Sequence, residues 1–421
     1  MANHPTEHNH QNISDGFAAV RIAEYRFLMT GRFAFVTAMR MLSTLVGWWI
    51  YQITKEPFAI GLVGLSEVIP ALSMALYSGH QVDISDKRKL VLLSVTGYFF
   101  LALALFILSG AHAGKYADVN LITWCIYGIF FINGILRSFI GPAMNSMIAF
   151  VVPRELLQNA TTWNQGTWLS ASVTGHAVGG FLIALIGISN TLLFICCLVL
   201  LSFFLFTQIK PKPPQHLNTE QKTWHSVLDG LRFVFHTKAL LGAMAVDMFA
   251  VLFGGAVAMV PVFAADILKV GAVGFGWLNA AADIGAIAIV ILLTFFPMKH
   301  SQGRKMLIAV AGFGICIILF GLSKWFWLSF AALLISGMLD GVSVVVRGTV
   351  MQLLTPDHMR GRVSSVSGMF ILSSNELGQF ESGLAAKLMG VVPSVIFGGC
   401  MTLAVVVTTW FKAPTLRKFE Y

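Results

Sequence analysis

Residues 79–89 read GHQVDISDKRK, a short polar and basic segment between two long apolar stretches. Each neighbouring stretch is long enough to cross a hydrocarbon core about 30 Å thick as a helix. Similar stretches recur along the whole chain with short polar breaks. We therefore predict an all-α membrane protein with twelve transmembrane helices, at about 27–51, 58–78, 90–110, 120–143, 161–187, 189–209, 239–263, 273–297, 305–323, 326–350, 363–390 and 392–411.

The composition agrees with this prediction. Of the 421 residues, 57% are apolar and 11% are charged, whereas soluble domains carry about 25% charged residues. These values exclude a soluble enzyme, a nucleic-acid-binding protein and a disordered chain. The five cysteines form no C-x-x-C pair, and the sequence has no phosphate-binding loop or nucleophile motif. We expect no enzymatic activity, no cofactor and no metal.

The basic residues predict the orientation of the chain. If the N-terminus is cytoplasmic, nineteen of the 28 lysines and arginines fall in cytoplasmic segments and four in outer loops. Membrane proteins keep such residues on the cytoplasmic side, so we expect both termini there, in a bacterial inner membrane. The longest polar break divides the chain into a tail, a six-helix bundle, a linker with a short amphipathic helix, a second bundle and a tail, at 1–26, 27–209, 210–238, 239–411 and 412–421.

The two halves also resemble each other in sequence. An offset of 203 residues places Pro153 on Pro356 and Gly134 on Gly337 without a gap. The same offset places Arg137 on Asp340. Halves that match in this register predict parallel six-helix repeats, an arrangement found among membrane transporters.

The segment at 79–89 resembles the signature loop of the major facilitator superfamily, G-x-x-x-D-x-x-x-[RK]-[RK]. The resemblance implies a twelve-helix transporter whose halves are latched on the cytoplasmic side when it opens outward. A carboxylate in this loop can accept hydrogen bonds from a helix N-terminus or an arginine, and a glycine allows close helix contact. The alternative is an ordinary basic loop. The expected cytoplasmic gate comprises Gly79, Asp83, Lys87, Arg88, Arg360 and Arg362.

Two longer stretches are similar to one branch of that superfamily, the drug and siderophore exporters that include the enterobactin exporter and the macrolide efflux proteins. They lie at 247–271 and at 340–383. Antiporters of the superfamily carry G-P-x-x-G-G in their fifth helix, whereas this chain reads GHAVGG at 175–180. His176 replaces the proline and its bend, and the glycines still predict tight helix packing. The packing candidates are Gly175, Gly179, Gly180, Gly378 and Gly383.

Ionisable residues inside the predicted spans are candidates for function, because each costs about 2.5–3.5 kcal/mol to insert. A buried carboxylate that water can reach is able to take up and release a proton. The proton-coupling candidates are Asp340, Glu376 and Asp247. The resemblance implies that helices 1, 4, 7 and 10 line a central cavity, and the substrate-cavity candidates are Arg40, Arg137, Asn375 and Gln379.

Structural roles compete with these assignments. Asp247 could equally be a latch, and Asp340 could share an ion-pair network with Arg347, seven residues later on the same helix face. Arg32 and Arg347 lie near cytoplasmic helix ends, and we expect them to extend toward water.

The residues and the resemblance together predict a monomeric, proton-driven exporter of amphipathic small molecules that works by alternating access. Uptake of a small metabolite is the first alternative. A membrane sensor or a lipid scramblase on the same scaffold is an alternative of another class. The sequence does not specify the substrate.

Overall fold

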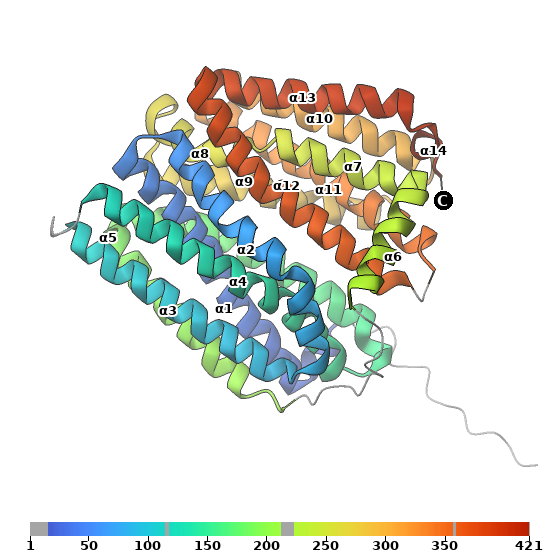
Figure 1. Ribbon diagram of the computed structural model, residues 1–421, viewed down its shortest axis with the longest axis horizontal. Helices are drawn as coiled ribbons and strands as arrows, with labels where there is room; N and C mark the ends of the chain where they lie inside the picture. The colour runs from blue at the N-terminus through green and yellow to red at the C-terminus, as the bar shows by residue number, and fades with distance from the viewer. Residues whose placement is uncertain (1–15, 114–117, 212–222, 357–358, 421) are drawn as a thin grey trace, which may run out of the picture.

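The computed structural model is a bundle of long helices (Figure 1), and it describes residues 16–113, 118–211, 223–356 and 359–420. The N-terminal half contains α1 (Ala23–Thr54), α2 (Pro57–Ile84), α3 (Lys87–Ala113), α4 (Val119–Val151) and α5 (Leu157–Thr207). After α6 (Thr223–His236), the C-terminal half contains α7 (Lys238–Phe253), α9 (Gly271–Phe295), α10 (Gln302–Leu322), α11 (Phe326–Leu354), α12 (Arg360–Met389) and α13 (Val391–Lys412). The short segments are η2 (Ala19–Arg21), η3 (Arg154–Leu156), η4 (Ala256–Met259), α8 (Val260–Val262), η5 (Phe263–Ile267) and α14 (Pro414–Arg417).

The helices account for the predicted spans. Ten stretches in the described part of the chain are long and apolar enough to cross a membrane. One of them contains α5, whose 51 residues are interrupted at Gly187 (φ 79°, ψ 175°), so it supplies two spans. The 30-residue α12 is not among the ten, because polar and charged residues lower its hydropathy. With both adjustments the helices are compatible with the predicted twelve spans.

One predicted helix is wrong in its extent. The sequence predicts a continuous helix over 239–263, whereas α7 ends at Phe253 and a 3-10 turn, one turn of α-helix and a π-helical turn follow. Gly254 and Gly255 lie at the interruption. A Cβ on Gly254 would lie 2.5 Å from the Phe313 ring, and one on Gly255 would lie 2.9 Å from the carbonyl oxygen of Gly378. The two glycines therefore let this break pack directly against α10 and α12.

Two helix pairs join the halves, α2 with α12 and α5 with α9 (Figure 1). Each pair crosses through glycines. A Cβ on Gly383 would lie 2.9 Å from the Cα of Gly61, and one on Gly180 would lie 2.4 Å from the carbonyl oxygen of Ala272. The missing side chains allow the backbones to approach this closely.

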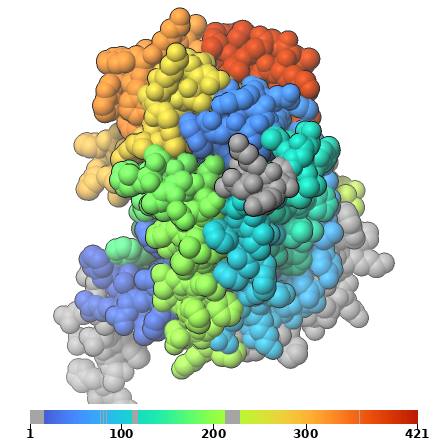
Figure 2. Space-filling model, turned by 90° about the vertical axis from the view of Figure 1, so that its left-hand side faces the viewer, coloured from blue at the N-terminus to red at the C-terminus, as the bar shows by residue number. Residues whose placement is uncertain are grey.

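The contacts across the halves gather toward the end of the molecule that carries the links at 55–56, 268–270 and 390. We call it the opposite end, because it lies opposite the linker end, where the segment joining the two halves begins. The linker end carries the link at 85–86, the end of α5, the start of α6 and the end of α11. At the opposite end, Tyr51 donates a hydrogen bond to Asp266, and Trp48 stacks on Phe275 with ring centroids 5.6 Å apart. Figure 2 shows the blue segment around the α1–α2 link lying against the yellow segment of the C-terminal half. The halves are therefore closed at the opposite end.

The repeat is visible in the packing. A Cβ on Gly134 of α4 would lie 2.1 Å from the carbonyl oxygen of Glu67 in α2. A Cβ on Gly337 of α11, 203 residues later, would lie 2.0 Å from the carbonyl oxygen of Ala282 in α9. Equivalent glycines thus make equivalent helix contacts in the two halves.

Candidate functional site

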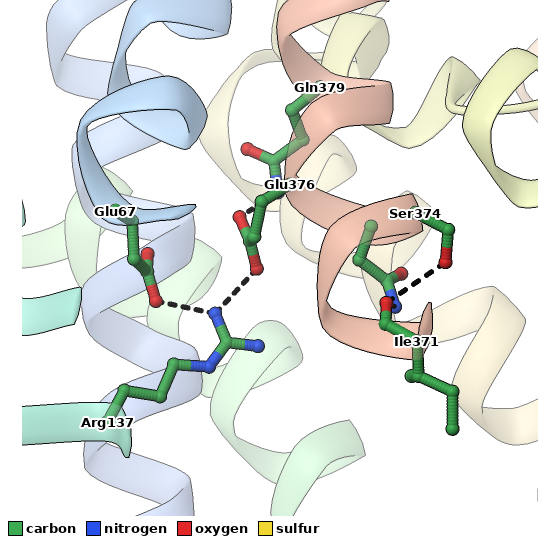
Figure 3. Close-up of polar contacts among 7 residues, drawn as sticks. Glu67, Arg137, Ile371, Ser374, Glu376 and Gln379 are labelled. Atoms are coloured by element: carbon green, nitrogen blue, oxygen red, sulfur yellow. Dashed lines mark hydrogen bonds and ion pairs between the residues drawn. The ribbon is translucent and has the colours of Figure 1, made fainter. Parts of the chain in front are cut away.

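A charged cluster lies between the halves, beneath the glycine crossing of α2 and α12. Nη1 of Arg137, on α4, lies 2.5 Å from a carboxylate oxygen of Glu67 on α2 and 2.5 Å from one of Glu376 on α12. Figure 3 shows Arg137 reaching toward both acids. Gly134, one turn before Arg137, allows the close approach of α4 to α2 that brings the guanidinium to this position. One arginine therefore connects two helices of one half to a helix of the other.

Burial makes this cluster electrostatically strong. The Glu67 and Glu376 side chains are 10% and 5% exposed, while Arg137 is 41% exposed and so borders open space. Charge pairs screened from water interact more strongly than surface pairs. With both acids ionised, the cluster has one more negative than positive charge.

The two polar candidates on α12 differ in their contacts. Gln379 donates a hydrogen bond to Glu376 at 3.2 Å and so extends the cluster. Its side chain also packs against α2, because a Cβ on Gly64 would lie 2.9 Å from the Cβ of Gln379. Asn375 is exposed and donates to the carbonyl oxygen of Ile371 on its own helix, at 2.8 Å.

A second polar cluster lies beneath the crossing of α5 and α9. Ser172 of α5 donates a hydrogen bond to Asp283 of α9 at 2.5 Å. Nε2 of His176 lies 3.8 Å from the same carboxylate oxygen, and its Nδ1 lies 2.7 Å from the hydroxyl of Thr44 on α1. This cluster also connects the two halves, through the short hydrogen bond from Ser172 to Asp283 and the longer contact of His176 with the same carboxylate.

Arg40 lies between the two clusters. Its guanidinium is 5.0 Å from the ring centroid of Trp168 on α5, a cation–π contact. Its electrostatic partners are Asp283 of the second cluster and then Arg137, Glu376 and Glu67 of the first. A change of charge in either cluster therefore acts on Arg40.

The remaining acidic candidates lie within the C-terminal half. Asp247 of α7 forms an ion pair with Arg347 of α11 and accepts a hydrogen bond from Ser343 at 3.1 Å. Arg347 therefore pairs with Asp247, not with Asp340. Asp340 is half-buried, and within the described ranges it has no hydrogen bond or ion pair. In the same ranges, no three His, Cys, Asp or Glu side chains are placed to hold a metal ion.

The family follows from a comparison with known proteins. Residues 28–378 match the family model of the Major Facilitator Superfamily. The chain belongs to this superfamily. Two similar curated proteins are the enterobactin exporters EntS of Shigella boydii serotype 4 and Shigella flexneri, at 26% and 27% identity over 94% of this chain and 93% of each relative.

Solved structures show the same fold at low identity. A POT family transporter in complex with 5-aminolevulinic acid aligns with a TM-score of 0.73 and 11% identity, over 93% of this chain and 96% of its own. A bacterial homologue of the iron transporter ferroportin, in an inward-facing state, aligns with a TM-score of 0.71 and 14% identity, over 96% and 100%. The protein is thus a multi-pass membrane transporter for small molecules, not an enzyme.

The residues that we expect to form the cytoplasmic gate lie at the linker end in two separate groups. In the N-terminal half, Arg88 donates to the carbonyl oxygen of Thr207 at 2.7 Å, and Lys87 lies 5.5 Å from the Phe150 ring centroid. Apart from its own helix, no atom of the described residues lies within 4 Å of a Cβ position on Gly79, so this glycine makes no close contact with another described helix in this conformation. Asp83 is the last but one residue of α2, and its side chain lies outside the described part of the structure.

The second group belongs to the C-terminal half. Arg360 begins α12, and Arg362 donates to Asp229 of α6 at 3.1 Å. This contact attaches α6 to α12 at the linker end.

The five packing glycines all contact another helix. Gly175 and Gly179 face α1, where their Cβ positions would lie 2.5 Å from the Cβ of Arg40 and 3.2 Å from the Cα of Met41. Gly378 faces α7. Gly180 and Gly383 face the other half, as described above.

Sequence reasoning missed several members of both clusters. Glu67, Asp283 and His176 were not among the candidates, although each is an ionisable group in a predicted span. The insertion cost of such groups was the signal that could have found them. The expectation that Arg32 and Arg347 extend toward water is wrong. They are 9% and 8% exposed, because Arg32 donates to Asn145 and Arg347 pairs with Asp247.

Proposed function

We propose that the protein is a secondary active, proton-driven exporter of amphipathic small molecules, and that the cluster at Arg137 couples proton binding to alternating access. The observation that carries this proposal is the double contact of Arg137 with Glu67 in one half and Glu376 in the other. A transporter that alternates must break and remake contacts between its halves. A contact made of charges can be broken by a proton or by a charged ligand.

Glu376 is the proposed coupling residue. A proton on Glu376 removes the charge that holds Arg137, which weakens the link between α4 and α12 and favours opening at the opposite end. Arg137 then stays paired with Glu67 alone, so the contact that is lost is the one between the halves, and the equilibrium shifts toward the state in which they separate here. A substrate group that binds Arg137 would compete with Glu376 for the same cation. Such competition would make proton binding and substrate binding interdependent.

Asp340 and Asp247 are the less favoured candidates for proton coupling. Asp340 is half-buried and has no hydrogen bond or ion pair among the described residues, so it is the next coupling candidate. Asp247 is held by Arg347 and Ser343 inside one half, which supports a structural latch. Arg40, Asn375 and Gln379 are proposed to line the substrate cavity with Arg137.

The orientation is also part of the proposal. Most lysines and arginines outside the spans belong to segments at the linker end and to the termini. We place the linker end and both termini in the cytoplasm of a bacterial inner membrane, so the structure corresponds to an inward-facing state. The proposed parts of the monomer are the cytoplasmic tail, first bundle, linker, second bundle and C-terminal tail, at 1–26, 27–209, 210–238, 239–411 and 412–421.

The cytoplasmic gate follows from this orientation. When the linker end closes, residues 79–89 would meet the start of α12 and its Arg360 and Arg362. Close approach would then use Gly79, which has open space around it in this conformation. Asp83 would accept hydrogen bonds from the facing half.

Export is the favoured direction because similar proteins over the whole chain are named enterobactin exporters. A siderophore-type or drug-type substrate follows from the same names. Uptake is the second candidate, because the D-xylose-proton symporter shares the fold with a TM-score of 0.70. A sensor or scramblase would have no need for a charged link between the halves.

Proteoliposomes with an imposed proton gradient test the proposal. A panel of siderophores and amphipathic dyes is offered, and accumulation is followed with and without a protonophore. We expect accumulation that collapses with the protonophore and does not need ATP. Accumulation that follows ATP, or that is unchanged by the protonophore, would exclude proton-driven transport.

A further inference from the structure

A cavity of about 530 Å³ lies within the N-terminal half, apart from both interhelical clusters. It is formed by α1, α4 and α5 on the side of the linker end. Its polar lining comprises Arg32, Asn145, Thr161, Asn164 and Gln165, and Trp168 forms an aromatic wall. The apolar lining residues are Ile148, Ala149 and Leu157. The lining therefore contains one cation and no acid.

Two buried polar atoms at this cavity have no protein partner. Nε of Arg32 and Oδ1 of Asn164 are each buried without a hydrogen bond, and each residue is only 9% exposed. Arg32 uses Nη1 to donate to Asn145 at 3.0 Å, which holds the side chain in place but leaves Nε unused. An unsatisfied buried polar group costs about 1–3 kcal/mol, and more when it is charged. Both side chains line the cavity, so a ligand that turns them toward it, with an acceptor for Arg32 and a donor for Asn164, would remove this cost.

The aromatic wall connects the cavity to the interior. The ring of Trp168 lines the cavity, and the guanidinium of Arg40 lies 5.0 Å from the centroid of the same ring. A flat aromatic group bound against Trp168 would therefore lie beside Arg32, while Arg40, which does not line the cavity, contacts the same ring. A cavity of this volume is large enough for a small aromatic molecule.

We propose that this cavity is an entry site that binds an aromatic anion carrying a hydrogen-bond donor, such as a hydroxylated aromatic carboxylate. The anion pairs with Arg32, the donor with Oδ1 of Asn164, and the ring with Trp168. The inference rests on the proposed function, because it makes the cavity the first site at which the exported substrate binds. It also states a substrate class that the charged cluster alone does not define.

Calorimetric titration of the purified full-length protein tests the site. The probes are 3-hydroxy-2-naphthoate and its neutral amide, 3-hydroxy-2-naphthamide. We expect the acid to bind at least about tenfold more tightly than the amide, since hydrogen bonds to charged groups contribute about 1.5–3 kcal/mol. Arg32→Gln should remove this preference, and Asn164→Leu should weaken both probes. Arg26→Gln, at an exposed position on the same helix, is the matched control and should bind as the original protein does.

Arg32→Gln also loses the contact with Asn145 and could misfold, so a second variant tests the cavity independently. Ala149→Phe keeps every polar group and fills the cavity, so it should abolish binding of both probes. The proposal is overturned if the original protein does not bind the acid, if acid and amide bind equally, or if Arg32→Gln and Ala149→Phe bind like the original. The last result would show that the probe binds elsewhere on the protein.

Failure of this site can be told apart from failure of the proposed function. The probe titration reports on the cavity alone, and proton-driven accumulation by the original protein reports on the proposed function. If the original protein shows no proton-driven transport but the probe pattern holds, the function is wrong and the site stands. If transport is proton-driven but the probe pattern fails, the site is wrong and the function stands.

Discussion

The two interfaces between the halves are related by the internal repeat but carry different chemistry. The offset of 203 residues places Gly180 on Gly383 and His176 on Gln379. Each glycine forms a close crossing near the opposite end, with α9 in one case and α2 in the other. Beneath one crossing, Arg137 holds two buried acids at 2.5 Å, whereas beneath the other His176 lies 3.8 Å from Asp283.

This difference separates the role of the scaffold from that of the site. The glycines are equivalent because both crossings need the same close backbone contact. The polar residues differ because Arg137 is a cation between two acids, a link that a proton or a charged ligand can break, whereas Asp283 is held mainly by the hydroxyl of Ser172. We therefore expect the α2–α12 interface to control coupling and the α5–α9 interface to act as a stable contact. Four predictions test this comparison.

The largest effect is expected from Arg137→Gln. The change leaves Glu67 and Glu376 close together without a cation, and removing one partner of a buried pair costs about 3–5 kcal/mol. Transport in proteoliposomes should fall to background. Arg137→Lys is the matched control and should keep part of the activity, because it retains the charge but not the guanidinium. Near-normal transport by Arg137→Gln at an equal protein level would show that the link is dispensable.

The next effect contrasts the two interfaces directly. Glu376→Gln mimics a permanently protonated acid, so it should abolish accumulation against a gradient but leave substrate binding and downhill exchange measurable. Asp283→Asn should lower transport only a few-fold. Asp340→Asn is measured on the same preparations as the second coupling candidate. Normal pH-dependent accumulation by Glu376→Gln would transfer the coupling role to Asp340 or Asp247.

A smaller effect concerns the glycine crossings. A Cβ added by Gly180→Ala would lie 2.4 Å from a backbone oxygen of α9, so the helices must separate or strain. Overpacking of this kind typically costs about 1–3 kcal/mol and should lower the thermal unfolding midpoint. Gly128→Ala, with open space around its Cβ position, is the control. Equal midpoints for both variants would argue against a tight crossing in the membrane.

The smallest effect is expected from His176→Gln. The amide can still contact Thr44, and it makes this position the same residue type as Gln379 in the other interface. Transport should stay within about threefold, and its pH profile should not change, because the α5–α9 interface is not the coupling site. A shifted pH profile would assign a proton-binding role to His176 instead.

The sequence by itself determined the helical spans, the division into two related halves and the superfamily. Hydropathy is read from neighbouring residues, and a span needs only about 20 of them, so helix positions follow from local composition. The break of helix 7 was missed because it depends on Phe313 and Gly378, which lie far along the chain.

Only the tertiary structure decided which charged residues meet. Arg137 is 70 residues from Glu67 and 239 residues from Glu376, and no local pattern relates these positions. The sequence identified Arg137 and Glu376 as costly groups that each needed a partner, but the choice among several oppositely charged residues depended on how the helices pack. The same holds for Arg347, which pairs with Asp247 on another helix and not with Asp340 on its own. Helix packing places side chains in space, and ion pairs form between those that it brings together.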